Sequence, residues 1–450
     1  MEAKKRISVS LGLVAVFISI ILFQHYSHFE DATWTKMWML LVMMSVASVG
    51  LTLIFNTKNY ALHSARIFSG ILFVFSGFVK TIDPLGSKYK FIDYFDAWGI
   101  GFLEPTALTF GILLSMIELV VGLMLLFKIY PKISTLLALL FMIGFTPVTL
   151  YLALQENITG SELVHDCGCF GDALILTNWQ TFVKNLVILV PVIIIFMKRS
   201  QFSYITTRFK SGVMVGFFML CSVGMSVYAL EYLPPIDFRP YKVGTKLVSS
   251  NCTPGLKSAQ EKVLYAEFIH KETGEHKLFN ISTDYPQDTI WEYNIDEPVR
   301  EEIVQKNDLD LDSLFPGQEI FRVDNFLFSK NSEERTCDII SDKGYVFLFV
   351  AYDIKSTETE SMNHINDICE WAMNNDVKFY GATSSLDEEI EKFKKKTHAQ
   401  FEMLDADDIP LKTIVRANPG LVLLKNGVVI NKWHSNTLPS IEEFENEIIK

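Results

Sequence analysis

The sequence has no excess of basic residues, and this absence excludes one broad class of function. Its 40 Lys and Arg residues are outnumbered by 52 Asp and Glu residues, so the formal net charge is −12. Residues 231–450 carry a net charge of −16, whereas residues 1–230 carry +4. Because an acidic surface repels phosphate groups, we expect no nucleic-acid partner, and no anionic lipid partner for the acidic half.

Charged residues are also scarce over long stretches of the first 230 residues, and these stretches predict an α-helical bundle in a lipid bilayer. Each stretch is close to the length at which a helix crosses about 30 Å of hydrocarbon. The seven predicted spans cover residues 7–23, 37–55, 65–79, 106–127, 134–154, 181–197 and 213–230. The first span lacks an A-x-A-like cleavage site and another span follows it directly. We therefore expect a retained anchor rather than a cleaved signal peptide.

The basic residues near the predicted spans indicate how the bundle is oriented. If the N-terminus is cytoplasmic, eleven Lys and Arg residues fall on the cytoplasmic side and five on the outer side. Short segments rich in Lys and Arg stay in the cytoplasm. An odd number of spans then places everything after about residue 231 outside. We predict a multi-pass protein of the bacterial inner membrane with a periplasmic C-terminal half.

Two cysteines separated by one residue, Cys167 and Cys169, lie in a short polar loop between two predicted spans. A disulfide between them closes a small, bent ring, and Gly168 supplies the backbone freedom that the bend requires. A strained, exposed disulfide is readily reduced, so such pairs are typical of exchange rather than of structure. The first interpretation is therefore thiol–disulfide chemistry at a membrane surface.

Two other interpretations of this loop stay open. Its cysteines could form a structural disulfide, for example to Cys252 or Cys337. The adjacent His165, Asp166 and Asp172 could instead contribute to a metal site. Metal sites usually need a second cluster of ligands, and the sequence lacks one at suitable spacing, so we predict no metal.

An acidic residue, Glu118, lies near the middle of the fourth predicted span. An ionisable group at that depth is unfavourable and is a candidate for function by default. It could carry protons for redox chemistry. It could also be a protonated carboxyl group that forms a hydrogen bond to a neighbouring helix.

The third predicted span ends in the pattern S-G-x-x-K-x-x-D-P-x-G at residues 76–86. Small residues at positions 69, 70, 76 and 77 permit close contact with another helix. The Asp-Pro pair predicts that the helix stops and that the chain turns at the outer surface. Lys80, Lys88 and Lys90 would then form a cationic rim there, either as interfacial residues or as a ligand site.

The pattern at residues 76–86, Glu118 and the C-G-C-F-G sequence at 167–171 together resemble the DoxX/MauE group of redox-associated membrane proteins. The resemblance covers about residues 61–200 and implies a four-helix core. Residues 1–60 and 201–230 then add two N-terminal spans and a seventh span. The resemblance also implies a disulfide relay in which Cys167 and Cys169 exchange with thiol-containing periplasmic partners. The resemblance also allows a quinone as the cofactor. However, quinone-linked bundles of the vitamin K epoxide reductase type have C-x-x-C, whereas this chain has C-x-C.

Residues 231–337 are predicted to form a β-rich periplasmic segment, and residues 338–450 an α/β domain. In the first segment, residues 262–269 and 277–281 have the pattern of a hairpin, and Cys252 and Cys337 could bond to each other. In the second, strand-like runs at 345–351, 377–383, 421–424 and 428–433 are mixed with helix-like runs at 361–375, 385–398 and 441–449. The K-N-G sequence at 425–427 predicts a tight hairpin turn. This order fits an open α/β sandwich.

The N-P-G sequence at 418–420, with the buried strand and the K-N-G hairpin that follow, resembles the thioredoxin fold. The resemblance implies that Pro419 is the cis-proline of that fold and lies where an extended peptide or partner binds. It also places Ile354 and Thr357 where the C-x-x-C cysteines belong. We therefore expect no dithiol chemistry in this domain. Cys369, which lies among apolar residues of a predicted helix, is expected to be a buried packing residue.

These features support two functional interpretations. The leading one is a membrane protein for thiol–disulfide exchange with, or maturation of, periplasmic partners. In it Cys167 and Cys169 exchange electrons, Glu118 manages protons, and the thioredoxin-like domain holds the client. The alternative is a non-enzymatic scaffold or accessory subunit of an envelope protein assembly. The missing C-x-x-C pair and the lack of a second reactive cysteine pair favour the alternative.

Overall fold

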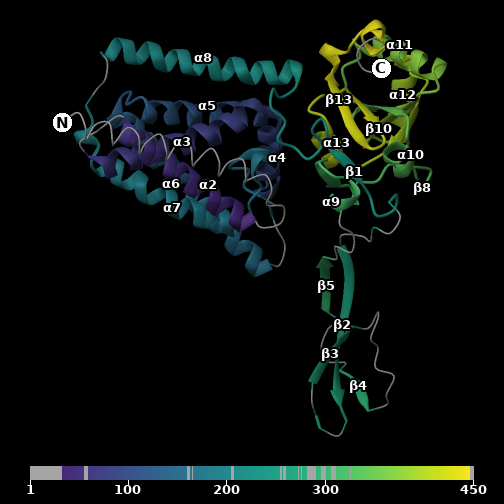
Figure 1. Ribbon diagram of the computed structural model, residues 1–450, viewed down its shortest axis with the longest axis horizontal. Coiled ribbons are helices and arrows are strands. Elements are labelled where there is room, and N and C mark those ends of the chain that lie inside the picture. Colours follow the sequence, from purple (N-terminus) through teal and green to yellow (C-terminus); the bar gives the residue numbers. More distant parts are fainter. Residues whose placement is uncertain are drawn as a thin grey trace. The chain divides into compact units, whose positions relative to one another are not determined.

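A computed structural model of the protein describes residues 33–54, 59–159, 163–164, 166–203, 207–253, 256, 260–271, 273–274, 276–280, 290–294, 300–305, 311–324 and 326–445. These residues form two compact units that divide between Phe238 and Arg239. The first unit is helical, and the second is rich in β-strands (Figure 1).

The first unit is a bundle of long, apolar helices. Its helices are α2 (Thr33–Ile54), α3 (Tyr60–Ile82), α4 (Pro84–Ala97), α5 (Ala107–Leu126), α6 (Pro131–Thr159), α7 (Asn178–Met197) and α8 (Arg208–Tyr232). Among the described residues, six helices are long and apolar enough to cross a membrane, namely all of these except α4. They correspond to the second to seventh predicted spans. The first predicted span, residues 7–23, lies outside the described residues.

Helices α3 and α5 pack side by side along their lengths (Figure 1). A Cβ atom added at Gly77 would lie 2.4 Å from the Leu119 backbone nitrogen, and one added at Gly122 would lie 2.5 Å from the Val74 backbone nitrogen. No side chain fits at either position, so glycine sets the distance between the two helices. The prediction that small residues of the third span permit close helix contact is confirmed for Gly77.

A buried arginine holds one end of this helix pair. The Arg66 guanidinium of α3 donates hydrogen bonds to the carbonyl oxygens of Leu125 and Leu126, the second at 2.7 Å. Carbonyl groups in the last turn of a helix have no partner within the helix, and the cation also complements the negative end of the helix dipole. Arg66 therefore fixes the position of α3 along the axis of α5.

The chain leaves α3 where the Asp-Pro pair predicted that it would stop. Asp83 ends α3 and also caps α4, because its Oδ1 accepts a hydrogen bond from the Gly86 backbone N–H at 3.0 Å. Pro84 occupies the first turn of α4, where its missing N–H is tolerated. The segment predicted as a surface turn is thus the start of a further helix, and that helix carries Lys88 and Lys90.

Helix α8 is attached to α3 through hydroxyl groups. Thr81 Oγ1 lies 3.3 Å from Ser222 Oγ, and Ser226 Oγ donates a hydrogen bond to the Thr81 carbonyl oxygen at 3.1 Å. Other side chains of α8, such as Phe209 and Leu220, are apolar and exposed. A broad apolar face of this kind is typical of a helix in contact with lipid.

The second unit is organised around a nine-stranded sheet with the order β6-β1-β13-β12-β9-β10-β11-β7-β8. Its strands are β1 (Lys246–Val248), β6 (Ile320–Arg322), β7 (Ser329–Lys330), β8 (Glu333–Glu334), β9 (Tyr345–Val350), β10 (Lys378–Thr383), β11 (Glu402–Asp405), β12 (Gly420–Lys425) and β13 (Val428–His434). β9, β10 and β11 are parallel, whereas β12 is antiparallel to β9 and to β13. This central part is the predicted α/β arrangement.

Helices cover this sheet and complete its core. They are α9 (Leu311–Leu314), α10 (Thr336–Ile340), α11 (Met362–Asn374), α12 (Asp387–Thr397), α13 (Asp408–Ile414) and α14 (Ile441–Glu443). Phe347 and Phe349 of β9 pack with Ile368 of α11 and Phe393 of α12 in one buried cluster. The predicted helices at 361–375 and 385–398 are confirmed, whereas β11 and α13 are additional elements.

Residues 231–337 and 338–450, predicted as two domains, share the nine-stranded sheet. β1 pairs with β13, β7 pairs with β11, and a disulfide joins Cys252 to Cys337. The strands of the first segment that join this sheet have two or three residues each. So short a strand has too little alternation to be recognised by its pattern.

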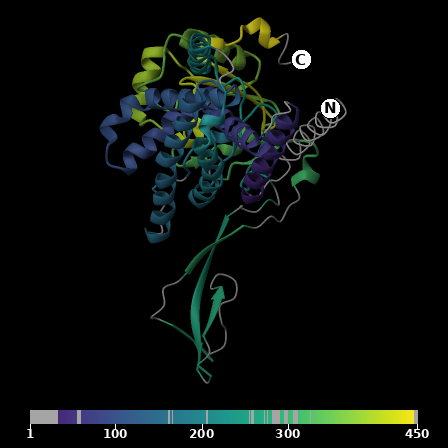
Figure 2. The same ribbon diagram turned by 90° about the vertical axis from the view of Figure 1, so that its left-hand side faces the viewer.

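The predicted hairpins are both present. β2 (Gln260–His270) pairs antiparallel with β3 (His276–Asn280) in a separate four-stranded sheet, which β4 (Trp291–Tyr293) and β5 (Arg300–Gln305) complete. Both views show β2 as a long strand with β3 beside it (Figures 1 and 2). In the turn between β12 and β13, Asn426 and Gly427 have φ angles of 50° and 68°. These left-handed conformations are those that a two-residue hairpin turn requires.

Replacing Gly77 by Ala should destabilise the bundle, because the new methyl group would meet the backbone of α5 and force the helices apart. We expect a loss of about 1–3 kcal/mol, the usual effect of overpacking a close contact. The measurement is thermal unfolding of the purified protein in detergent. Gly144→Ala in α6 is the matched control, since a Cβ there has no atom within 4 Å. Equal melting temperatures for the two variants would contradict this account of the α3–α5 contact.

Candidate functional site

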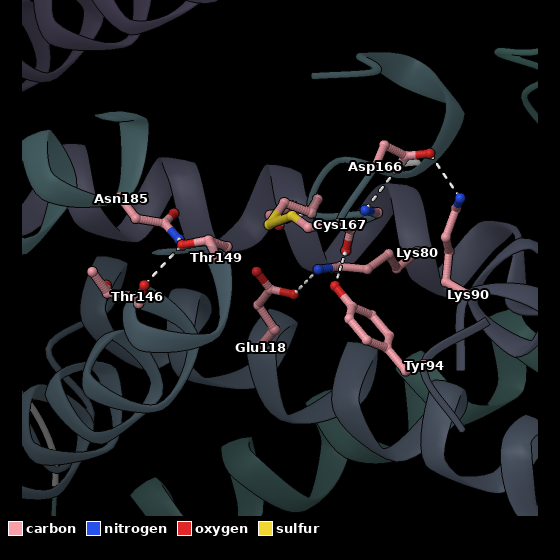
Figure 3. The surroundings of a disulfide bond; sticks show 12 residues. Lys80, Lys90, Tyr94, Glu118, Thr146, Thr149, Asp166, Cys167 and Asn185 are labelled. Carbon is pink, nitrogen blue, oxygen red and sulfur yellow. Dashed lines mark hydrogen bonds and ion pairs between the residues drawn. A yellow bond between two sulfur atoms is a disulfide. The ribbon is translucent and has the colours of Figure 1, made fainter. Parts of the chain in front are cut away.

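The C-G-C loop lies between α6 and α7, and its two cysteines form a disulfide with each other (Figure 3). Gly168 between them has φ +65°, and a Cβ atom there would lie 2.9 Å from Cγ of Lys90. Glycine is therefore required for both the conformation and the space. The alternative of a structural bond from this loop to Cys252 or Cys337 is wrong, because those two cysteines bond to each other.

One edge of the loop is held by polar groups of α4. The Asp166 carboxylate accepts a hydrogen bond from the Gly168 backbone N–H at 2.8 Å and forms an ion pair with Lys90 Nζ at 2.7 Å. The Tyr94 hydroxyl donates to the Cys167 carbonyl oxygen at 3.4 Å. Burial by itself lowers the pKa of Lys90, but the carboxylates of Asp166 and Asp93 outweigh it and hold that pKa above its ordinary value. Lys90 is thus a permanent cation at this edge.

The other edge of the loop is held by α3 and α7. Ser76 Oγ of α3 donates to the Cys169 carbonyl oxygen at 2.6 Å. The next residue, Phe170, is buried and packs against Phe75 with ring centroids 5.5 Å apart. Lys184 Nζ of α7 lies 4.3 Å from the centroid of the Phe170 ring, which is a cation–π distance. The loop is therefore fixed on both sides of its disulfide.

A buried ion pair joins α3 to α5 in the surroundings of the disulfide (Figure 3). It links Lys80 Nζ to the Glu118 carboxylate, and the two side chains are only 10% and 5% exposed. Lys80 follows Ser76 by one helical turn, so both face the same side of α3. The expectation that Lys80 belongs to a surface rim is wrong, because the glycine contact between α3 and α5 brings it against Glu118 inside the bundle. Glu118 has an ammonium partner instead of a neutral one.

Polar side chains of α6 and α7 complete these surroundings. Asn185 Nδ2 donates to Thr149 Oγ1 at 3.3 Å, and Thr149 Oγ1 donates to the Thr146 carbonyl oxygen at 2.9 Å. The side-chain hydroxyls of Thr146 and Thr181 are buried and have no hydrogen-bond partner among the described residues. Sequence reasoning missed this group. The signal was present, because 146 and 149, and likewise 181 and 185, are spaced to share one face of a helix.

The described residues contain no group of three or more His, Cys, Asp or Glu side chains that could hold a metal ion. His165, one of the residues considered for such a site, lies outside the described residues. Asp166, another, is occupied by Lys90 and Gly168.

In the second unit, the structure brings together the residues predicted around Pro419. The Asn418–Pro419 peptide bond is cis, and Pro419 itself is buried. Asn418 Oδ1 accepts a hydrogen bond from Thr357 Oγ1 at 3.0 Å, and Asn418 Nδ2 donates to the Asp353 carbonyl oxygen at 2.8 Å. The loop that contains Ile354 and Thr357 therefore lies directly beside Pro419, without a cysteine at either position.

Cys369 belongs to the core of the second unit and not to this loop. It is buried in α11, and burial raises the pKa of its thiol to about 11. A thiol that stays protonated at neutral pH is a weak nucleophile. The prediction that Cys369 is a packing residue is confirmed.

Comparison with known proteins finds one family that matches most of the helical unit. Residues 58–198, which run from α3 to the end of α7, match the model of a family described as methylamine utilisation protein MauE. The match contains the disulfide loop, Lys80, Glu118 and Lys184. Neither the curated proteins nor the solved structures include a match to this chain. The helical unit is thus similar to a family of membrane proteins, and the rest of the chain lies outside that match.

Removing one partner of the buried ion pair should lower the free energy of unfolding far more than removing both. Glu118→Leu leaves the Lys80 ammonium without its counter-ion, and we expect a loss of about 3–5 kcal/mol in the free energy of unfolding. The double variant Lys80→Met/Glu118→Leu should regain most of that loss. Unfolding by denaturing detergent measures both, with Glu104→Gln at an exposed position as the control. Lys80→Met is also made alone. If the losses in unfolding free energy of the two single variants add up to the loss of the double variant, the two residues are not a coupled pair.

Proposed function

We propose that the protein exchanges disulfides with thiol-containing partner proteins at the periplasmic side of the bacterial inner membrane. The observation that carries the proposal is the Cys167–Cys169 disulfide, which is half-buried and held against a bundle of apolar helices. Cys252 and Cys337 are bonded to each other and Cys369 is buried, so this loop holds the disulfide suited to exchange. The match of residues 58–198 to the MauE family supports the role of a membrane accessory protein in the maturation of another protein.

The reaction is a transfer of two electrons from a client dithiol to the loop. A client thiolate attacks one sulfur of the Cys167–Cys169 bond, that bond breaks, and a mixed disulfide forms. The second client thiol then attacks the mixed disulfide. The client leaves with a disulfide, and the protein retains two thiols, having gained two electrons and two protons.

Glu118 and Lys80 would handle charge during this reaction. The thiolates released from the loop are anions next to an apolar bundle, where an unpaired charge is strongly unfavourable. The Lys80 ammonium can offset such a charge, and Glu118 can exchange a proton with the thiols. Their ion pair supports this role because it places both groups together inside the bundle.

Return to the disulfide requires an oxidant, for which we propose a quinone of the membrane. A quinone ring is apolar and has two carbonyl oxygens that accept hydrogen bonds. The buried hydroxyls of Thr146 and Thr181, which lack a partner in the described part of the chain, fit that requirement, as does the Asn185 amide on α7. When bound, the quinone would accept the two electrons and two protons; the threonine hydroxyls and Asn185 would orient it, and the apolar helices would exclude water.

The second unit would hold the client. Its order of strands β10-β9-β12-β13, with β12 antiparallel to β9, supports the thioredoxin-like interpretation of residues 338–450. Pro419 is buried, so we propose that the client contacts the exposed residues Lys355, Ser356 and Glu358 of the loop beside it. With Ile354 and Thr357 in place of cysteines, this unit binds without exchanging electrons.

A non-enzymatic scaffold is the second candidate. The absence of cysteine from the loop beside Pro419 favours it, because a relay often passes electrons between two reactive pairs. In that case the Cys167–Cys169 bond would only tie its loop together. A stable partner in fixed stoichiometry, together with full function of a Cys167→Ser variant, would support the scaffold.

Exchange predicts that a mild reductant frees Cys167 and Cys169 and that the disulfide form oxidises a dithiol. We would tag free thiols in intact membranes before and after dithiothreitol and locate the tags by peptide mapping. The purified protein should also oxidise a synthetic two-cysteine peptide, one disulfide per chain.

The matched control for this experiment is Cys221→Ser, since Cys221 is exposed on α8 and unpaired. It should leave peptide oxidation unchanged, whereas Cys167→Ser and Cys169→Ser should each reduce it at least about 100-fold because the disulfide cannot form. Untagged cysteines after reductant, or an active Cys167→Ser variant, would exclude exchange by this loop.

A further inference from the structure

The two cysteines of the loop have different surroundings, although both are half-buried. Cys167 lies beside α4, a helix that is not among the membrane-spanning candidates. Its neighbour Asp166 pairs with Lys90, whose side chain is 30% exposed. Lys90 also lies 3.4 Å from Asp93, so the single ammonium at this edge faces two carboxylates. This edge of the disulfide is polar and open to an approaching client.

Cys169 lies at the edge of the loop that α3 and α7 hold. Its carbonyl oxygen accepts the hydrogen bond from Ser76, and its neighbour Phe170 is only 1% exposed. Lys80 lies one turn beyond Ser76 on the same side of α3, and Lys184 lies over the Phe170 ring. The groups at this edge are therefore buried, and two of them are lysines.

On the interior side, the described residues include two lysines and one carboxylate. Lys80 and Lys184 are both buried, and Glu118, the carboxylate that acts on both, forms its ion pair with Lys80. No carboxylate of the described part of the chain forms an ion pair with Lys184, which is 3% exposed. On α6, the nearest acidic group to this helix is Glu156, which accepts a hydrogen bond from Asn178 at 3.4 Å. A buried cation without a counter-ion is unfavourable until an anion forms beside it.

We infer that Cys167 is the sulfur that the client attacks and that Cys169 leaves as a thiolate, which Lys184 stabilises. The inference rests on the proposed exchange function and adds the direction of attack. Attack at the open edge forms the bond between the client sulfur and Cys167 Sγ. The electron pair of the broken Cys167–Cys169 bond then goes to Cys169 Sγ, at the edge of the loop where Lys184 lies over the Phe170 ring. A thiol with a cationic neighbour is the better leaving group. Lys184 is thus a positioning residue for charge.

The direction of attack can be tested on the unmodified full chain. The probe is a synthetic peptide with a single cysteine, which forms a mixed disulfide but cannot complete the exchange. The reaction is stopped with acid after short times, free thiols are alkylated, and the adduct is located by mass spectrometry. We expect the peptide on Cys167 at least about tenfold more often than on Cys169. A tenfold ratio of the two attack rates needs only a small difference in activation free energy.

Each outcome of this mapping decides a different point. Equal adducts, or an adduct mainly on Cys169, would overturn the inference while leaving exchange itself intact. No adduct on either cysteine, with the loop disulfide unchanged, would instead overturn the proposed function.

The role of Lys184 is tested by the pH profile of alkylation in the reduced protein. Lys184→Met should shift the profile of Cys169 upward by about one pH unit or more, because a thiolate loses its cationic neighbour. Cys167 should shift much less, and Lys184→Arg should restore the wild-type profile. Lys132→Met, at an exposed position of α6, is the control. A Cys169 profile that does not move, or equal shifts of both cysteines, would exclude Lys184 from this role.

Discussion

The contact between α3 and α5 is the constraint on which the membrane site depends. Glycine at positions 77 and 122 lets the two backbones come closer than a side chain at either position would allow. This contact, with Arg66 holding the far end, places Lys80 opposite Glu118. A wider separation would leave two opposite charges apart in an apolar bundle, where each would be strongly destabilising. Close packing and charge pairing therefore support each other.

The disulfide loop extends the same arrangement beyond the helices. Ser76, one turn from Lys80, fixes Cys169, while Lys90 and Tyr94 of α4 fix the other side. The short link at Asp83 and Pro84 starts α4 directly after α3, and so brings both sets of anchors to one loop. The loop thus has one edge at which Lys90 meets the carboxylates of Asp166 and Asp93, and one edge near Lys184. This difference between the two edges is the basis of the proposed direction of attack.

The second unit combines segments that the sequence pattern separates. The strands at 345–350, 378–383, 420–425 and 428–434 were predictable, because each is long and bounded by turn residues. The added strands β1, β6, β7 and β8 were not, since two or three residues cannot display a period. Cys369 and the loop beside Pro419 could both be assigned from sequence, one by its apolar neighbours and the other by its missing cysteines. The burial of Pro419 itself could not be predicted from the sequence.

The sequence by itself determined six described spans, the Cys167/Cys169 pair, the place of Glu118 within a span and the main strands of the second unit. These features depend on composition, spacing and local periodicity, which a single chain displays directly. Only the tertiary structure decided that Lys80 lies inside the bundle, that Lys184 and the threonines of α6 and α7 belong to the site, and that Cys252 bonds to Cys337. Such facts depend on which faces of distant segments meet, and packing sets those faces through distances that no local pattern records.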